Sequence, residues 1–252
     1  MTNKLRKMLL AGCLASGLGL TTQVNAEELR IGYISPVTGI FAQVGKDMVD
    51  GFQLYLSEHN NKLGGMDVKF IVEDDQGKPD AGVTKAKKLI LQDKVHMFIG
   101  GLLASSGYAL APVSTSEKTL YISSVSSADD LTQRQLSKYP YFMRTSWTSS
   151  LPHHPLGQWA CDNGFKKVII IAADYAFGYE TAGGFQSAFE ACGGKVIQKI
   201  WPPLGTKDFG PYIPTFSPML TASSRPWSAR WRCSFPSNCA PPASKRRSWA
   251  AA

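Results

Sequence analysis

Apolar residues between positions 27 and 216 form short runs of strand length, separated by segments in which they recur every three or four positions. In the first part of this region, the runs predict strands at 29–34, 68–72, 95–99, 120–123 and 141–144. The intervening segments predict helices at 45–60, 79–92 and 105–118, the last of them broken by Pro112. In the first helix, one face carries the apolar residues expected to point inward, namely Met48, Phe52, Tyr55 and Leu56.

A second block repeats the alternation, with helices expected at 155–163 and 178–192 and strands at 167–172 and 195–201. Its first strand, which contains four apolar residues from Val168 to Ile171, does not alternate and therefore predicts burial on both faces. Strands that alternate with helices form parallel sheets covered by helices, joined by right-handed crossovers. We therefore expect an α/β protein with two doubly wound parallel-sheet lobes, linked near residues 145–152.

The N-terminal segment 1–26 has the pattern of a secretory signal peptide. Lys4, Arg6 and Lys7 precede an apolar run that is too short to span a bilayer, and Ala26 ends a small-residue cleavage site. We expect a mature chain that begins at Glu27 and is soluble in the periplasm. A lipoprotein processed at Cys13 is the alternative, and the apolar run that continues past this cysteine argues against it.

The composition changes after residue 216. Residues 217–252 contain three of the six tryptophans, six basic residues and no acidic residue, and they show neither helical nor strand periodicity. A disordered tail and an irregular docking segment are two interpretations, but a disordered tail fits poorly with three tryptophans. We favour a third interpretation, a frameshift near Ser217, because the change falls inside a lobe that still lacks strands. The second lobe would then be incomplete.

The net charge of +8 is concentrated at the two ends of the chain. The signal segment and the tail carry nine basic residues and no acid, which leaves residues 27–216 with a net charge of −1. We therefore expect no nucleic-acid partner. Within this region lie two cysteines, Cys161 and Cys192, and in an oxidising compartment they form either a disulfide or two separate buried thiols.

Serine pairs follow two of the predicted strands. Ser105 and Ser106 open a helix, where unpaired backbone amides and the helix dipole favour an anion such as a carboxylate. One of these serines would alternatively be a simple N-cap. Ser126 and Ser127 follow the next strand, and ligand contact is expected there as well, since the carboxyl ends of parallel strands line the binding crevice. For this second pair, Asp129 or Asp130 offers a competing cap.

Aromatic residues supply a further candidate site. Phe177 is expected to cover an apolar part of the ligand or, alternatively, to be an ordinary core residue, and Tyr175 is a weaker candidate for the same role.

Catalytic and metal-binding patterns are not found. Gly39 to Lys46 departs from a phosphate-binding loop in spacing, and no serine lies in a Gly-x-Ser-x-Gly elbow. His153 and His154 are adjacent and flanked by prolines, so we expect surface histidines rather than metal ligands. Asp74 and Asp75 precede a turn and are expected to bond to its backbone. We expect no catalytic residue, no cofactor and no metal.

Several motifs in residues 29–216 resemble, in order and spacing, those of the leucine/isoleucine/valine-binding proteins, the substrate-binding subunits of ABC transporters. The segments that carry the resemblance are IGYISPVTG (31–39), AQVG (42–45), LGGM (63–66), VEDDQGKP (72–79), FIGGLLASS (98–106), ISSVSS (122–127), DYAFGY (174–179) and TKDF (206–209).

The resemblance implies a type I periplasmic binding protein whose two lobes close on a small ligand, with residues 27–147 in the first lobe and 148–216 in part of the second. It implies ligand contacts at Ser105 or Ser106, Ser126, Ser127 and Phe177. Two departures affect the ligand's identity, because Val44 replaces a family tyrosine and the family's acidic ammonium ligand would lie beyond residue 216.

The predicted function is capture of a branched-chain amino acid or a related small carboxylate by a monomer, with delivery to a membrane ABC permease. A ligand-sensing receptor of the same fold is one alternative. A hydrolytic enzyme on an α/β fold is another, and it lacks a nucleophile or metal motif.

Overall fold

The structure is a computed structural model that describes residues 28–133 and 138–216. The expected signal segment and the tail after residue 216 lie outside the described residues. The chain divides into two compact units, the first ending at Ser146 and the second beginning at Trp147. Within the described ranges, no helix combines the length and apolar character needed to cross a bilayer.

A six-stranded sheet forms the centre of the first unit, in the order β2-β3-β1-β4-β5-β6. The strands are β1 (Leu29–Ser35), β2 (Lys62–Leu63), β3 (Met66–Asp74), β4 (Met97–Gly100), β5 (Leu120–Ser123) and β6 (Phe142–Arg144). Neighbouring strands are parallel, as expected, except for the short β2, which is antiparallel to β3. Gly64 and Gly65 connect β2 to β3 with φ of 57° and 84°, a left-handed conformation that favours glycine.

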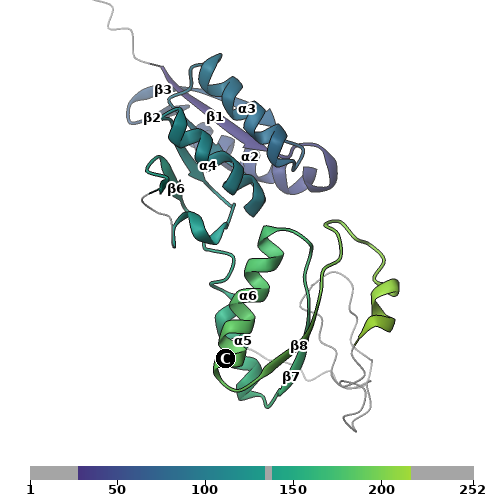
Figure 1. Ribbon diagram of the computed structural model, residues 1–252. Coiled ribbons are helices and arrows are strands. Elements are labelled where there is room, and N and C mark those ends of the chain that lie inside the picture. Colours follow the sequence, from purple (N-terminus) through teal and green to yellow (C-terminus); the bar gives the residue numbers. More distant parts are fainter. Residues whose placement is uncertain (1–27, 134–137, 217–252) are drawn as a thin grey trace, which may run out of the picture. The chain divides into compact units, whose positions relative to one another are not determined.

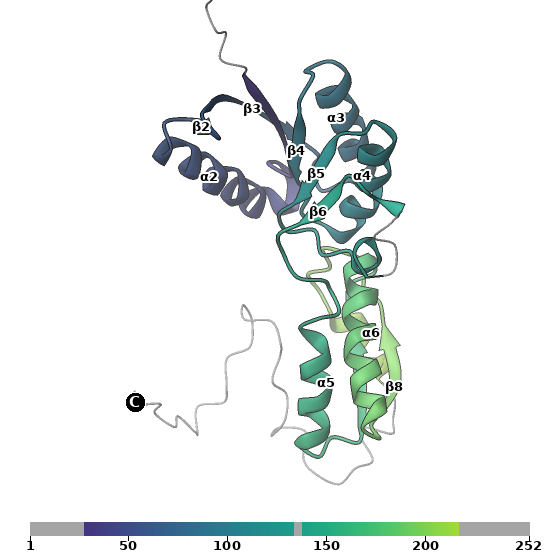
Figure 2. The same cartoon turned by 90° about the vertical axis from the view of Figure 1, so that its left-hand side faces the viewer.

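Helices cover both faces of this sheet. The helix α2 (Ala42–Glu58) lies on one face, and α3 (Pro79–Leu91) and α4 (Ala104–Ser116) lie on the other (Figures 1 and 2). Two short 3-10 turns, η1 (Gly39–Phe41) and η2 (Asp129–Leu131), complete the unit. The predicted break at Pro112 is wrong, because α4 continues through this residue. Burial of Leu110, Ala111 and Val113 around the proline supports the helix where one backbone hydrogen bond is lost.

The core between α2 and the sheet centres on buried residues from three elements, Ile31, Tyr33, Val49 and Ile99. Tyr55 was predicted to point inward and does not. Its side chain is 47% exposed and stacks on His59 at a ring-centroid distance of 4.0 Å. Successive helical residues are about 100° apart, so burial of Leu56 turns Tyr55 toward the outside.

The second unit contains α5 (His153–Asp162), β7 (Lys167–Ile171), α6 (Ala176–Ala191), β8 (Lys195–Ile200) and the 3-10 helix η4 (Gly210–Thr215). The strands β7 and β8 are parallel, and α5 packs against α6. Gly157 permits this close approach, since a Cβ there would lie 2.5 Å from the Phe185 carbonyl oxygen. A disulfide joins Cys161 to Cys192, with 6.4 Å between their Cα atoms. Of the two alternatives for these cysteines, the structure therefore has the covalent one.

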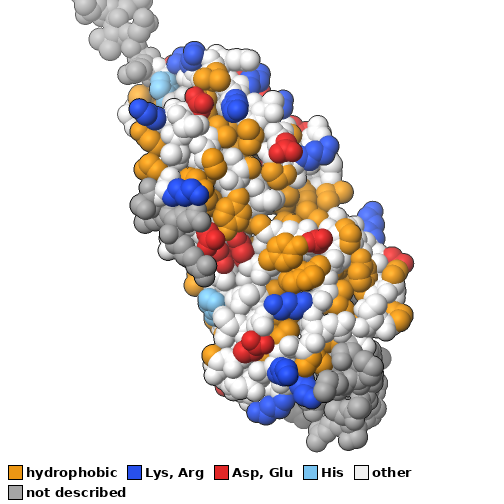
Figure 3. All heavy atoms as spheres, viewed as in Figure 1, with side chains coloured by type: hydrophobic (Ala, Val, Ile, Leu, Met, Phe, Trp, Pro, Cys, Tyr) orange, Lys and Arg blue, Asp and Glu red, His pale blue; other side chains and the backbone are white. Residues whose placement is uncertain are grey.

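Burial of β7 on both faces was also predicted, and it is not observed. Val168 to Ile171 are half-buried, because the described part of this unit has a sheet of two strands. Apolar side chains are correspondingly gathered on the visible surface of the unit, over α6 and the segment after β8 (Figure 3). Among the exposed residues are Tyr179, Leu204, Phe209 and Ile213.

Candidate ligand-binding site

The carboxyl ends of β1, β3, β4 and β5 meet at one edge of the first unit, as parallel strands require. Asp74, at the end of β3, organises this edge. Its carboxylate accepts hydrogen bonds from the backbone amides of Val37 (3.1 Å) and Gln76 (2.8 Å) and from the Thr38 hydroxyl. Burial acts to raise the pKa of Asp74, but these hydrogen bonds outweigh it and hold the pKa below its usual value. Asp74 therefore ties the loop after β1 to the turn after β3.

Asp75 has a different environment. The residue is fully buried, and its Oδ1 accepts a hydrogen bond from the Gly77 amide at 3.0 Å. Its Oδ2 is buried without a hydrogen-bond partner among the described residues. Burial raises the pKa of this carboxyl, and the neighbouring charge of Asp74 adds to the increase. Both aspartates bond to turn backbone, as the sequence predicted, but the low dielectric around Asp75 favours its protonated form.

The helix α4 begins at this edge directly after β4. Leu103 is its N-cap and provides no side-chain hydrogen bond, so neither serine is the N-cap that the alternative interpretation required. Ser105 and Ser106 occupy the second and third helical positions, where the backbone amides have no carbonyl partner within the helix. Ser105 is half-buried. Ser106 is fully buried, and its Oγ has no hydrogen-bond partner in the described chain.

Ser126 and Ser127 lie in the loop after β5. The Ser126 hydroxyl donates to the Leu103 carbonyl at 2.9 Å, and its amide donates to the Gly101 carbonyl at 3.0 Å. Ser126 therefore holds this loop against the start of α4. Ser127 is 5% exposed and also interacts within the protein. Ligand contact by either serine stays a prediction.

Neither of the two aspartates is the N-cap of the short helix in this loop. The N-cap of η2 is Ala128, and Asp129 and Asp130 are its first two residues. The Asp130 amide instead donates to the Tyr108 Oη of α4 at 3.1 Å.

In the second unit, three rings gather where β7 ends and α6 begins. Tyr175 is the N-cap of α6, Phe177 lies in its first turn, and His153 is the first residue of α5. The Phe177 ring centroid is 6.0 Å from that of Tyr175 and 6.4 Å from that of His153. All three residues are half-buried, unlike the core residue Phe189 of the same helix, which is fully buried. We call these three residues the three-ring surface.

Burial raises the pKa of the Tyr175 hydroxyl, so this group remains protonated at neutral pH. Sequence reasoning missed His153, and placed it with His154 on the surface. The position of His153 in the sequence could have indicated its place. It lies at the start of the helix that precedes β7, and such a helix begins at the edge of the sheet where that parallel strand ends.

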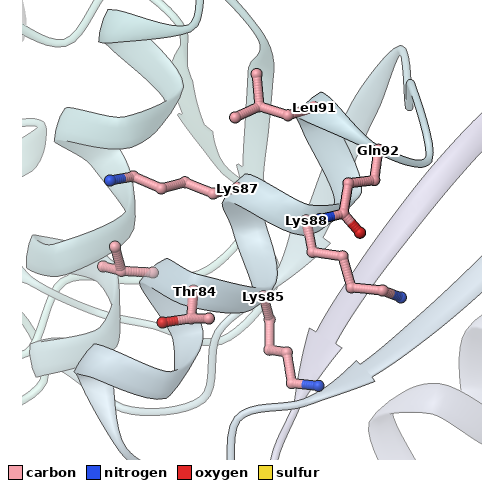
Figure 4. Close-up of a pocket in the computed structure, with 7 residues that line it drawn as sticks. Thr84, Lys85, Lys87, Lys88, Leu91 and Gln92 are labelled. Atoms are coloured by element: carbon pink, nitrogen blue, oxygen red, sulfur yellow. The ribbon is translucent and has the colours of Figure 1, made fainter.

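A depression of about 430 Å³ lies elsewhere in the first unit, along α3. Its lining includes Lys85, Lys87 and Lys88, and Figure 4 shows Lys87 pointing away from the other two lysines. Lys85 and Lys88 form ion pairs with Glu73, the former at 2.7 Å. Much of this lining lies toward the end of α3, and this helix runs back toward the amino ends of the strands. The depression is therefore separate from the edge at which the strands end and at which Ser105, Ser106, Ser126 and Ser127 lie.

Within the described part of the chain, no cluster of three histidine, cysteine or acidic side chains is arranged to hold a metal ion. The carboxylates of Asp74 and Asp75 lie at the end of β3, whereas the start of α4 carries backbone amides and serine hydroxyls, which donate hydrogen bonds. The start of α4 is therefore suited to bind an organic anion.

Comparison with known proteins identifies the class. The family described as "Periplasmic binding protein" matches residues 28–217, and the chain belongs to this family. A relative from Brucella abortus, Leu/Ile/Val-binding protein homolog 6, is 30% identical over 189 residues, which are 75% of this chain and 47% of the relative. The Leu/Ile/Val-binding protein of Escherichia coli is 29% identical over 146 residues, 57% of this chain and 38% of that protein. The chain thus spans about half the length of the curated relatives it matches.

Solved structures lead to the same class. A solute-binding protein of an ABC transporter from Rhodopseudomonas palustris BisB5, in complex with 3,4-dihydroxybenzoic acid, is similar at 32% identity and a TM-score of 0.69. Another from R. palustris, in complex with 4-hydroxybenzoate, is similar at 30% identity and a TM-score of 0.67. They cover 75% of this chain, and the matched regions are 51% and 50% of those chains. The fold is therefore that of the type I periplasmic binding proteins, and the family implies an extracytoplasmic location.

Proposed function

We propose that this chain is the solute-binding component of an ABC transporter and that it captures a small carboxylate. The observation that carries the proposal is the start of α4, where unpaired amides meet the hydroxyls of Ser105 and Ser106. A helix N-terminus favours a negatively charged ligand, because its unpaired amides can donate hydrogen bonds to the ligand and the positive end of the helix dipole lies there. A ligand carboxylate would also give the buried Ser106 hydroxyl the partner that it lacks.

Within the class of small carboxylates, we propose an aromatic acid in preference to a branched-chain amino acid. The similar solute-binding proteins from Rhodopseudomonas palustris are complexes with hydroxylated benzoic acids. The three-ring surface of the second unit offers aromatic faces and edges, against which another ring packs favourably. The names of the curated relatives support the branched-chain amino acids as the second candidate.

The remaining steps belong to the same proposal. The chain would be exported through the segment 1–26, bind its ligand without transforming it, and deliver it to a membrane permease as a monomer. Export is supported by the pattern of the N-terminal segment. The absence of catalysis is supported by the family, whose members bind solutes. N-terminal sequencing of the periplasmic protein, with Glu27 as the expected first residue, tests the export step.

Calorimetric titration with benzoate, 4-hydroxybenzoate and leucine tests the ligand. We expect the aromatic acids to bind more tightly than leucine. Replacing Ser105 or Ser106 with alanine should weaken their binding about 10- to 100-fold, because a hydrogen bond to a charged group contributes about 1.5–3 kcal/mol. Ser116→Ala is the matched control, since Ser116 lies at the other end of α4 and bonds to the Val113 carbonyl.

Two results would count against this function. If none of the three ligands binds, the proposal of carboxylate capture is wrong for this chain. If they bind and both serine variants retain full affinity, the carboxylate is held elsewhere.

A further inference from the structure

The side chain of His153 is held in one orientation by two contacts. Its Nδ1 lies 3.0 Å from the Ser149 carbonyl oxygen, and its ring meets that of Phe177 at an angle of 83°. A carbonyl oxygen only accepts hydrogen bonds, so Nδ1 must carry the proton. In the neutral imidazole, Nε2 is then the acceptor, and it has no hydrogen-bond partner among the described residues.

The position of this acceptor matters because of its neighbours. His153 is half-buried beside Phe177, which in turn contacts Tyr175. Phe177 and Tyr175 therefore offer rings against which a ligand ring can pack, and His153 offers a ring nitrogen with a lone pair. A carboxylate would not suit this nitrogen, since both groups accept hydrogen bonds. A hydroxyl group on an aromatic ring suits it, because the hydroxyl donates while the ring packs against Phe177.

We propose that His153 is a specificity-determining residue that accepts a hydrogen bond from a hydroxyl group on the aromatic ring of the ligand. This inference rests on the proposed function, namely capture of a small aromatic carboxylate. The ring hydroxyl of the ligand would donate to Nε2 of His153 on α5.

The test compares 4-hydroxybenzoate with benzoate, which differ in the hydroxyl alone. His153→Phe keeps a ring beside Phe177 and removes the acceptor. His153→Gln removes the ring and retains an amide oxygen that can accept. His154→Phe is the matched control, because His154 is the exposed neighbour on the same helix and lies outside the three-ring surface. All four forms of the full chain are titrated with both ligands by calorimetry.

We expect the unsubstituted chain to prefer 4-hydroxybenzoate. His153→Phe should reduce this preference about 3- to 10-fold, the effect of losing one neutral hydrogen bond. His153→Gln should retain part of the preference, and His154→Phe should leave it unchanged. An unaltered preference in His153→Phe would overturn the inference.

The outcomes separate this inference from the proposed function. Loss of benzoate binding in Ser106→Ala, together with an unaltered hydroxyl preference in His153→Phe, would leave carboxylate capture standing and remove the role of His153. Absence of binding by either ligand would overturn both. A second measurement does not depend on binding. Long-range ¹H–¹⁵N NMR spectra of the free protein should show the proton of the neutral His153 ring on Nδ1, and a neutral ring protonated on Nε2 would overturn the inference.

Discussion

The disulfide between Cys161 and Cys192 should stabilise the second unit substantially. It joins the last turn of α5 to the residue that follows α6, across a sequence separation of 31 residues. In the chain-entropy description, a cross-link lowers the entropy of the unfolded chain by about 2.1 + 1.5R ln n cal/mol/K, where n is the loop length. For this loop the decrease is about 12 cal/mol/K, or about 3.7 kcal/mol at 25 °C.

The perturbation is the double substitution Cys161→Ala and Cys192→Ala. Both cysteines are half-buried, so loss of packing adds little to the loss of the cross-link. We expect the free energy of unfolding of the second unit to fall by about 2–4 kcal/mol, since engineered and natural cross-links often contribute less than the entropic value. The same loosening should weaken aromatic ligand binding, because α5 and α6 carry His153 and Phe177.

The assay needs a probe of the second unit, because two units can unfold separately. Tryptophan fluorescence is suitable, because the tryptophans among the described residues, Trp147, Trp159 and Trp201, all belong to the second unit. This fluorescence should report a lower urea midpoint in the double variant. In the unsubstituted chain, peptide mapping without reduction should recover the Cys161–Cys192 peptide pair. Recovery of both cysteines as free thiols, or a loss of less than about 1 kcal/mol, would refute the reasoning.

Two further predictions concern the first unit. Replacing Asp75 with Asn should stabilise the protein at neutral pH by about 1 kcal/mol, because it removes a buried carboxylate with an unpaired oxygen. Burial raises the pKa of Asp75 in the folded protein above its value in the unfolded chain. The buried carboxylate therefore destabilises the folded protein increasingly as the pH rises from the pKa in the unfolded chain through the pKa in the folded protein. The gain should therefore vanish in acid, and thermal melts that show an equal gain at every pH would contradict this. Gly107→Ala should destabilise the unit by about 1–3 kcal/mol and weaken carboxylate binding, because its Cβ would lie 2.2 Å from the Ser126 Oγ. Gly183→Ala in α6 is the control, since nothing lies within 4 Å of its Cβ, and it should stabilise by up to about 1 kcal/mol. Equal melting temperatures for the two glycine variants would argue against the close contact at Gly107.

Three features could be predicted from the sequence alone: the α/β class, the parallel pairing of β1, β3, β4, β5 and β6, and the family. These features depend on local periodicity and on the order of motifs, which are visible without coordinates. Ser105 and Ser106 could also be placed at the start of a helix, because a strand that ends in glycines is followed by an apolar stretch of helical spacing. Local pattern was insufficient at Tyr55 and Pro112, where packing decided exposure and helix continuity.

The contacts that each candidate side chain makes depend on the tertiary structure. Ser126 and Ser106 look alike in the sequence, yet the hydroxyl of Ser126 is used by the Leu103 carbonyl, 23 residues earlier, and that of Ser106 has no such partner. His153 and Phe177 come together only because α5 and α6 begin at the same edge of the second unit. A hydrogen bond or ring contact depends on distances between segments far apart in the chain, and periodicity along the sequence carries no information about those distances.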